Sequence, residues 1–242
     1  MQSPLSLVRS VKSAWHRDLA ATPETHAWVL NLYRAGEKHP QTVLDYFPAD
    51  YAPVPELAAL LIRHREDELR HTRMYGRAIE ALGQPIEELA GLDVFNNAIR
   101  KFTPASFFIE PRVSDDEKAD KVAHFLAHAH HLERRIAASL EHHVEACAAL
   151  GRDRVATVVE VVLADEHRHV AYTREMVFAV VPARRARDIM AIHARGESRA
   201  HRVFSARQVR AFLARFPGRG AQYRRAAYAL GALLMQGGLV DG

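Results

Sequence analysis

Apolar residues recur at every third or fourth position over four long segments of the chain, which is the spacing of one face of an α-helix. The sequence holds no sustained alternation of apolar and polar residues of the kind that predicts strands. The pattern therefore predicts an all-α fold. Its four long helices run from about Thr25 to Phe47 with a kink at Pro40, from Pro55 to Leu82, from Ser114 to the residue before Gly151, and from about Asp153 to Val180.

The segments outside these four helices give a second set of expectations. The long connection 84–113 is predicted to hold a short helix near Leu92–Lys101, and its apolar residues are expected to pack down: Phe102, Phe107, Phe108 and Ile109. Such a crossover suits a bundle whose middle pair of helices runs parallel. After Pro182 we expect two or three helices, roughly Ala183–Phe204, Ala206–Phe216 with Ser205 as its cap, and Ala221–Met235. We therefore expect a four-helix bundle over residues 1–182 and a basic helical extension over 183–242 that packs on it.

A glutamate interrupts the apolar stripe of each long helix. The four are Glu37, Glu68, Glu133 and Glu166. A buried carboxylate without a partner costs several kcal/mol, so four of them near the middles of four helices need positive charge among them. Two divalent metal ions would supply it.

Two of these glutamates begin the same four-residue motif, Glu-x-Arg-His, which occurs twice at an offset of 98 positions. Glu68 with His71, and Glu166 with His169, are spaced i, i+3, so both side chains of a pair project from one helix face and can hold a metal ion. An aspartate precedes each motif, Asp67 in one case and Asp165 in the other. Such an aspartate can accept the second ring N–H of a metal-bound histidine across the bundle.

Together these residues resemble the ligand set of the ferritin-like di-iron carboxylate proteins, over about Thr25–Val180. That superfamily includes rubrerythrins, bacterial multicomponent monooxygenases, stearoyl carrier-protein desaturases, the small subunit of ribonucleotide reductase and a tRNA hydroxylase. The resemblance implies a ferritin-like four-helix bundle with additional C-terminal helices. It also implies two iron ions, or manganese or a mixed Mn/Fe pair. Glu37 and Glu133 would be terminal ligands, Glu68 and Glu166 would bridge, and His71 and His169 would each complete one ion.

Several residues near the motifs keep more than one interpretation. Glu24 is an alternative to Glu37, and Glu141 is an alternative to Glu133. His64 is expected either to line a substrate pocket or to be a hydrogen-bonded core residue. Tyr75 resembles the radical-bearing tyrosine of the ribonucleotide reductase subunit in its offset from His71, but core packing is the preferred interpretation. Two further pocket candidates are Tyr33 and Thr173. The histidines of the third long helix are expected at the surface: His124, His128, His130, His131, His142 and His143.

Charge and cysteine content narrow the classes of function. Residues 183–242 hold twelve arginines and three acidic residues, a net charge of +9. A solvated face is the preferred interpretation of this charge, and nucleic acid, an acidic partner or a membrane surface are the alternatives. Cys147 is the only cysteine, so a disulfide framework, a CxxC redox pair and a zinc site built from cysteines are excluded within one chain. No segment is apolar enough for a signal peptide or a membrane span, so a cytoplasmic protein is expected.

The motifs predict a metal-binding site more specifically than they predict the reaction that the site would catalyse. The preferred function is an O2-activating oxidase or monooxygenase that acts on a small organic substrate and takes electrons from an external donor. One alternative is a ferroxidase or a peroxide-reducing protein of the rubrerythrin or manganese-catalase kind. The other is a tRNA-modifying hydroxylase. A homodimer is compatible with each of these functions.

Overall fold

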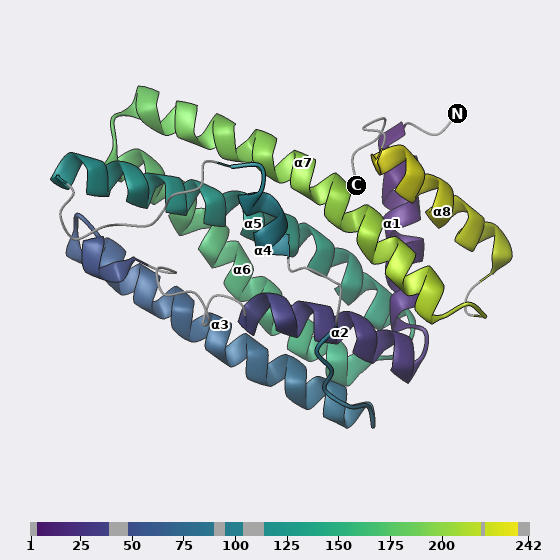
Figure 1. Ribbon diagram of the computed structural model, residues 1–242. Helices are drawn as coiled ribbons and strands as arrows, with labels where there is room; N and C mark the ends of the chain where they lie inside the picture. Colours follow the sequence, from purple (N-terminus) through teal and green to yellow (C-terminus); the bar gives the residue numbers. More distant parts are fainter. Residues whose placement is uncertain (1–3, 39–47, 90–94, 104–113, 219–220, 237–242) are drawn as a thin grey trace.

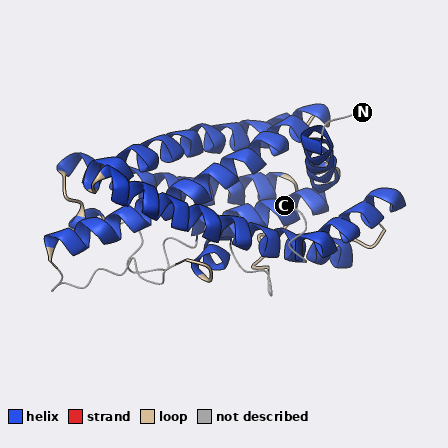
Figure 2. Cartoon of the chain, turned by 90° about the horizontal axis from the view of Figure 1, so that it is seen from above, coloured by secondary structure: helices blue, strands red, loops and turns tan. Residues whose placement is uncertain are grey.

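The computed structural model describes residues 4–38, 48–89, 95–103, 114–218 and 221–236. Over these residues the chain forms eight α-helices, one short 3-10 helix and no strand (Figures 1 and 2), which confirms the predicted all-α class. The elements are α1 (Pro4–Ala20), α2 (Pro23–Lys38), η2 (Ala49–Tyr51), α3 (Pro55–Ala81), α4 (Phe95–Arg100), α5 (Asp115–Ala149), α6 (Asp153–Val180), α7 (Ala183–Arg215) and α8 (Gln222–Gln236).

Four of these helices, α2, α3, α5 and α6, lie side by side (Figure 1). Helix α2 packs on α3, α3 packs on α6, and α6 packs along α5. Helices α3 and α5 run in the same direction, and α4 lies in the chain between them. The arrangement is compatible with the four-helix bundle and the long crossover that the sequence predicts.

The predicted bounds of α3, α5 and α6 agree with the structure to within one residue. At the start of α5, Ser114 Oγ accepts a hydrogen bond from the Glu117 backbone N–H at 3.3 Å, and Glu117 Oε2 accepts one from the Ser114 N–H at 3.2 Å. The predicted capping box is therefore present. Helix α2 is described as far as Lys38, so its expected continuation to Phe47 and the kink at Pro40 lie outside the described residues, as do Phe107, Phe108 and Ile109.

Two expectations for the segments around the bundle are wrong. Residues 183–215 form one uninterrupted helix, α7, so Ser205 lies inside a helix and is not a cap. Its hydroxyl contacts His201 Nδ1 one turn earlier, at 3.3 Å. Phe102 does not pack down, since 39% of it is exposed. Gly196 of α7 lies so close to this segment that a Cβ atom there would meet Thr103 Cγ2 at 2.5 Å. Helix α7 packs on both α4 and α5.

Helix α1 was not predicted, because its buried face is partly polar. Asp18 is nearly buried and accepts two hydrogen bonds from Arg224, at 2.8 and 2.9 Å, and one from the Tyr228 hydroxyl at 2.9 Å. Trp15 packs edge-on against Phe212 and Tyr228. These contacts join α1 to α7 and α8. Arg224 of the basic C-terminal region thus has an acidic partner within the protein and needs no nucleic acid to balance its charge.

The largest error of the sequence-based predictions is that they place the histidines of α5 at the surface. Four of them are buried, namely His128, His130, His131 and His143, and His124 and His142 are half-buried. The reason is that α1, α6 and α7 all pack on α5, so little of its surface remains for solvent. Each buried imidazole finds a polar partner: His128 contacts Asn96 Oδ1 at 2.7 Å, and His131 contacts the Met190 carbonyl at 3.1 Å.

Two apolar cores stand at opposite ends of the bundle, with a buried polar layer between them. One core gathers Leu57, Leu61, Val122, Phe125, Leu126, Met176 and Val177. The other gathers Leu30, Tyr75, Ile79, Leu140, Cys147, Val159 and Val162. Along α3, α5 and α6 the motif residues fall between the two sets, so the fold shields this layer from solvent on both sides.

Candidate metal centre

The polar layer contains all six residues that the sequence nominates as metal ligands. Each of them is 5% exposed or less, and they come from four helices: Glu37 from α2, Glu68 and His71 from α3, Glu133 from α5, and Glu166 and His169 from α6. The helical spacing produces this layer directly, because each glutamate occupies a stripe position that faces the inside of the bundle.

Within the layer, the donor atoms fall into two groups that could each hold a metal ion. One group is Glu37, Glu68, His71 and Glu166, and the other is His64, Glu68 and His169. In each group the donor atoms lie within 4.8 Å of one another. Glu68 belongs to both. Glu133 is beside the second group, with its Oε1 3.7 Å from His64 Nε2.

The two motif histidines make equivalent contacts across the α3–α6 interface. His71 Nε2 lies 2.9 Å from Asp165 Oδ2, and His169 Nε2 lies 3.3 Å from Asp67 Oδ2. Each Nδ1 atom faces glutamates: His71 Nδ1 is 3.4 Å from Glu37 Oε2, and His169 Nδ1 is 3.2 Å from Glu166 Oε2. One ring nitrogen is therefore held by an aspartate, and the other is directed at the carboxylates where an ion would sit.

Two arginines that the sequence analysis did not single out complete this interface. Arg70 and Arg168 each form ion pairs with both Asp67 and Asp165; the Arg70–Asp67 pair measures 2.6 Å and the Arg168–Asp67 pair 3.2 Å. The signal was visible, because both motifs carry an arginine at the same position, one residue before the histidine. These arginines balance the charge of the two aspartates and leave the four glutamates as the unbalanced charge of the layer.

The pKa values show what this unbalanced charge does. Burial, together with the nearby Glu37 and Glu133, raises the pKa of Glu68 well above its usual value, and burial with the same two neighbours raises the pKa of Glu166. Burial also raises the pKa of Asp67 and Asp165, but their histidine and arginine partners outweigh it and lower both pKa values. The aspartates are thus ionised, whereas Glu68 and Glu166 are driven to hold protons unless a cation takes their place.

His64 is closer to the metal centre than either of its sequence-based interpretations implies. Its Nε2 lies 3.3 Å from Glu68 Oε1, its ring stacks on the His169 ring with centroids 3.6 Å apart, and its Nδ1 is 2.7 Å from the Tyr172 hydroxyl. Burial and the neighbouring His169 lower the pKa of His64 to about 4, so the imidazole is neutral. His64 precedes Glu68 by one helical turn, which is the signal that could have placed it among the donors.

The structure also separates the nominated glutamates from their rivals. Glu37 and Glu133 are buried in the layer, whereas Glu24 is exposed in the first turn of α2. The side chain of Glu141 is 57% exposed and faces His167, whose Nε2 lies 3.8 Å away. Of the two candidates on each helix, only the nominated one contacts the other donors.

The pocket candidates lie beside the layer in different ways. Tyr75 is fully buried, and its hydroxyl has no hydrogen-bond partner among the described residues. The Tyr33 ring packs against the Tyr75 ring with centroids 5.7 Å apart. The Thr173 hydroxyl donates to the His169 carbonyl at 2.6 Å, so it serves the helix backbone. A role for these side chains toward a substrate stays a prediction.

The donor set fits a pair of divalent cations. Four glutamates carry four negative charges at full ionisation, which two divalent ions would balance. One oxygen each of Glu68 and Glu166 is buried without a hydrogen-bond partner within the described part of the chain. Carboxylate oxygens with a few imidazole nitrogens are the ligands that iron and manganese accept in proteins. The buried groups could therefore bind metal.

Comparison of the chain with protein-family models, with curated proteins and with solved structures finds no match. Within the described residues, no helix has both the length and the apolar character that crossing a bilayer requires.

Proposed function

We propose that this protein is a di-iron oxidoreductase that uses O2 to oxidise or hydroxylate a small organic substrate. The observation that supports it best is the pair of overlapping donor groups that share Glu68, buried between two apolar cores. When bound there, two ferrous ions would supply electrons to O2. Each hydroxylation would consume one O2, two electrons and two protons, and release the hydroxylated product and water. The two electrons would come from the ferrous ions, which an external reductant would return to the ferrous state.

The residues of the chain would prepare the centre for this chemistry. Glu37, Glu68, Glu133, Glu166, His71 and His169 would hold the ions, with His64 as a further nitrogen donor. Asp67 and Asp165 fix the orientation of the motif histidines through their Nε2 atoms. Arg70 and Arg168 hold those aspartates in turn, on the outer side of the α3–α6 interface. The two apolar cores exclude water from both sides, which strengthens electrostatic interactions inside.

The alternative functions differ in the substrate of the same centre. A ferroxidase or a peroxide-reducing protein would need no organic substrate. A tRNA-modifying hydroxylase would need a basic surface, but several arginines of the C-terminal region are engaged within the protein. Arg185 pairs with Asp120, Arg215 pairs with Glu87, and Arg224 pairs with Asp18. These contacts favour the hypothesis of a small organic substrate over that of a tRNA substrate.

The test is O2 consumption by the protein after anaerobic loading with ferrous iron. With a chemical reductant present, we expect consumption to accelerate when a panel of small organic compounds is added, and an oxidised product to be detected by mass spectrometry. Steady oxidation of excess iron without an organic product would instead identify a ferroxidase. An RNA affinity that falls steeply with salt would support the tRNA hydroxylase.

Two variants on α5 make a matched control for this test. Glu133→Ala removes a buried carboxylate of the layer, and Glu141→Ala removes an exposed one two turns further along the same helix. We expect the first to lower the rate of O2 consumption by at least about 100-fold, the size of effect seen when groups around a metal are lost, and the second to leave it unchanged. Equal rates in both variants would contradict the proposal.

A further inference from the structure

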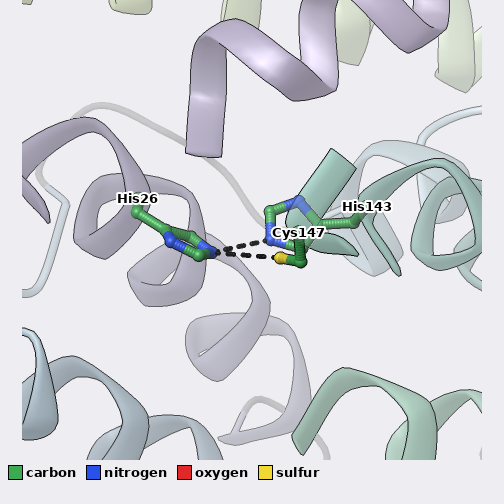
Figure 3. Close-up of side chains that lie close together, drawn as sticks. All are labelled: His26, His143 and Cys147. Atoms are coloured by element: carbon green, nitrogen blue, oxygen red, sulfur yellow. Dashed lines mark hydrogen bonds between the residues drawn. The ribbon is translucent and has the colours of Figure 1, made fainter. Parts of the chain in front are cut away.

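A second buried cluster of metal-binding side chains lies outside the candidate metal centre. It consists of His26 from α2 with His143 and Cys147 from α5, and we call it the His/Cys cluster (Figure 3). His26 Nε2 is 3.0 Å from His143 Nε2 and 3.7 Å from Cys147 Sγ. All three side chains are fully buried. His143 and Cys147 are spaced i, i+4, so α5 presents both of them to α2 from one face.

The His/Cys cluster is separate from the carboxylate layer. His26 precedes Glu37 by eleven positions on α2, and His143 follows Glu133 by ten on α5. At a rise of about 1.5 Å per residue, the two sites are about 15 Å apart. The Tyr33 ring packs against Tyr75 on the side of the carboxylate layer and against His143 on the side of the cluster. Neither site contributes a donor to the other.

The donor set of the His/Cys cluster suits a different metal from the carboxylate layer. Two imidazole nitrogens and one sulfur are ligands for zinc or cuprous copper, whereas hard oxygens favour iron and manganese. In a tetrahedral zinc site with Zn–N about 2.1 Å and Zn–S about 2.3 Å, neighbouring donors lie about 3.4–3.6 Å apart. The separations of 3.0 and 3.7 Å in the cluster are close to this, so small side-chain movements would complete the geometry.

The surroundings prepare the nitrogens for coordination. Burial and the nearby Arg152 lower the pKa of His26 to about 4, and burial with the nearby His16 and His26 lowers the pKa of His143 well below its usual value, which favours the neutral rings that a metal ion needs as ligands. His143 Nδ1 lies 3.4 Å from His16 Nδ1, which leaves His143 Nε2 for an ion. A partner on the second ring nitrogen is the usual way in which a metal-binding histidine is oriented.

A purely structural role accounts poorly for these residues. Burying the two imidazoles of the cluster costs more than burying apolar side chains of the same size, and only hydrogen bonds or a metal offset that cost. His26 Nδ1 has no hydrogen-bond partner within the described residues, so this ring is only half satisfied. An ion bound by the three side chains would replace the weak contact between the two Nε2 atoms with metal–ligand bonds and would join α2 to α5, and His26 Nδ1 would still need a partner of its own.

We propose that His26, His143 and Cys147 form a zinc site that is independent of the carboxylate layer. Binding forms one Zn–S and two Zn–N bonds and breaks the Cys147 S–H bond, with the proton released to solvent. An exogenous ligand such as water completes four-coordination. One cysteine is sufficient for such a mixed set, so the low cysteine content that argues against cysteine-rich zinc sites does not exclude it. His16 is a positioning residue in this site.

Cobalt substitution of the full chain tests this assignment. Because Cys147 is the only cysteine, a thiolate-to-Co2+ charge-transfer band can come from this cluster alone. We expect the band in the unchanged protein, its loss in Cys147→Ser and in His26→Gln, and its displacement by one equivalent of Zn2+. His16→Gln should keep the band but weaken Zn2+ binding by about 10- to 100-fold, as expected when a partner of a ligand is removed.

Two controls separate this site from the carboxylate layer. His142→Gln removes a neighbouring half-buried imidazole from α5 and should leave the band unchanged. Glu166→Ala with His169→Ala should also leave it unchanged, so that failure of the di-iron proposal would not affect the result. A folded protein that gives no sulfur charge-transfer band, or that gives the same band after His26→Gln, would overturn the proposal. Because copper binds nitrogen and sulfur donors more tightly than zinc does, the metal is identified by its content in the protein as isolated from cells; copper in place of zinc at this cluster would overturn the assignment to zinc.

Discussion

Replacing Glu166 and His169 together by alanine is expected to abolish the binding of iron, which we expect at about two ions per chain in the unchanged protein. The pair lies where both donor groups meet. Glu166 Oε1 is 3.6 Å from His71 Nδ1, and Glu166 Oε2 is 3.2 Å from His169 Nδ1. Removing both side chains therefore takes a ligand from each group. Metal analysis after anaerobic reconstitution and gel filtration measures the effect.

The matched control removes a glutamate and a histidine from the exposed face of the same helix. Glu175→Ala with His167→Ala should retain about two ions per chain, since both residues point to solvent. Circular dichroism must show the test variant to be folded, because it loses two buried side chains. The raised pKa of Glu166 means that its ionised form destabilises the metal-free protein as the pH rises, so removing it relieves a cost. A folded double variant that keeps its full iron content would contradict the ligand assignment.

Acidification from pH 6.5 to pH 4 is expected to destabilise the packing of α7 on α5 by several kcal/mol. Burial lowers the pKa of His131 from 6.5 to about 4, and burial with the nearby His128 and His124 lowers the pKa of His193 to about 2. Because both folded-state pKa values are depressed, the stability that these residues contribute is present above pH 6.5 and is lost as the pH falls. At about 1.4 kcal/mol per pH unit, each histidine loses about 3 kcal/mol over this range.

Thermal unfolding followed by circular dichroism across this pH range measures the loss. The combined loss of about 6 kcal/mol is comparable with the whole stability of an ordinary domain, so extensive unfolding is expected near pH 4. Replacing His131 and His193 together by glutamine should reduce the pH dependence. His167→Gln, at an exposed position, should leave it as it is. A melting temperature that stays constant from pH 6.5 to pH 4 would refute this account of the interface.

The bounds of α3, α5 and α6 could be predicted because apolar periodicity and local capping agree along each of them. Ser114 with Glu117 at the start of α5 is one such local signal, and Gly83 after α3 is another. The candidate ligands could be predicted from the same periodicity, since a glutamate on an apolar stripe must face the interior. Sequence is informative here because the interactions involved are short-range or repeat with the helical period.

The errors have a common physical cause, which is polar side chains buried against distant polar partners. Asp18 is buried because Arg224 and Tyr228 lie on it, and His143 is buried because His16 and His26 do. None of these partners is close in sequence. The periodicity of apolar residues therefore predicts that such polar positions face the solvent. The prediction of a helix cap at Ser205 was wrong for a different reason. Serine is favoured at caps, but here the helix continues through Ser205, and the hydroxyl of this residue is directed to His201.

We propose above all that the buried glutamates and histidines of four helices hold two metal ions. Anomalous diffraction at the iron absorption edge, from crystals of protein loaded anaerobically with ferrous iron, tests it most directly. We predict two iron peaks, one among Glu37, Glu68, His71 and Glu166, and one beside His64, Glu68 and His169, with Glu68 contacting both ions. A fully loaded crystal with no peak in this layer, or with iron bound only elsewhere, would contradict the account.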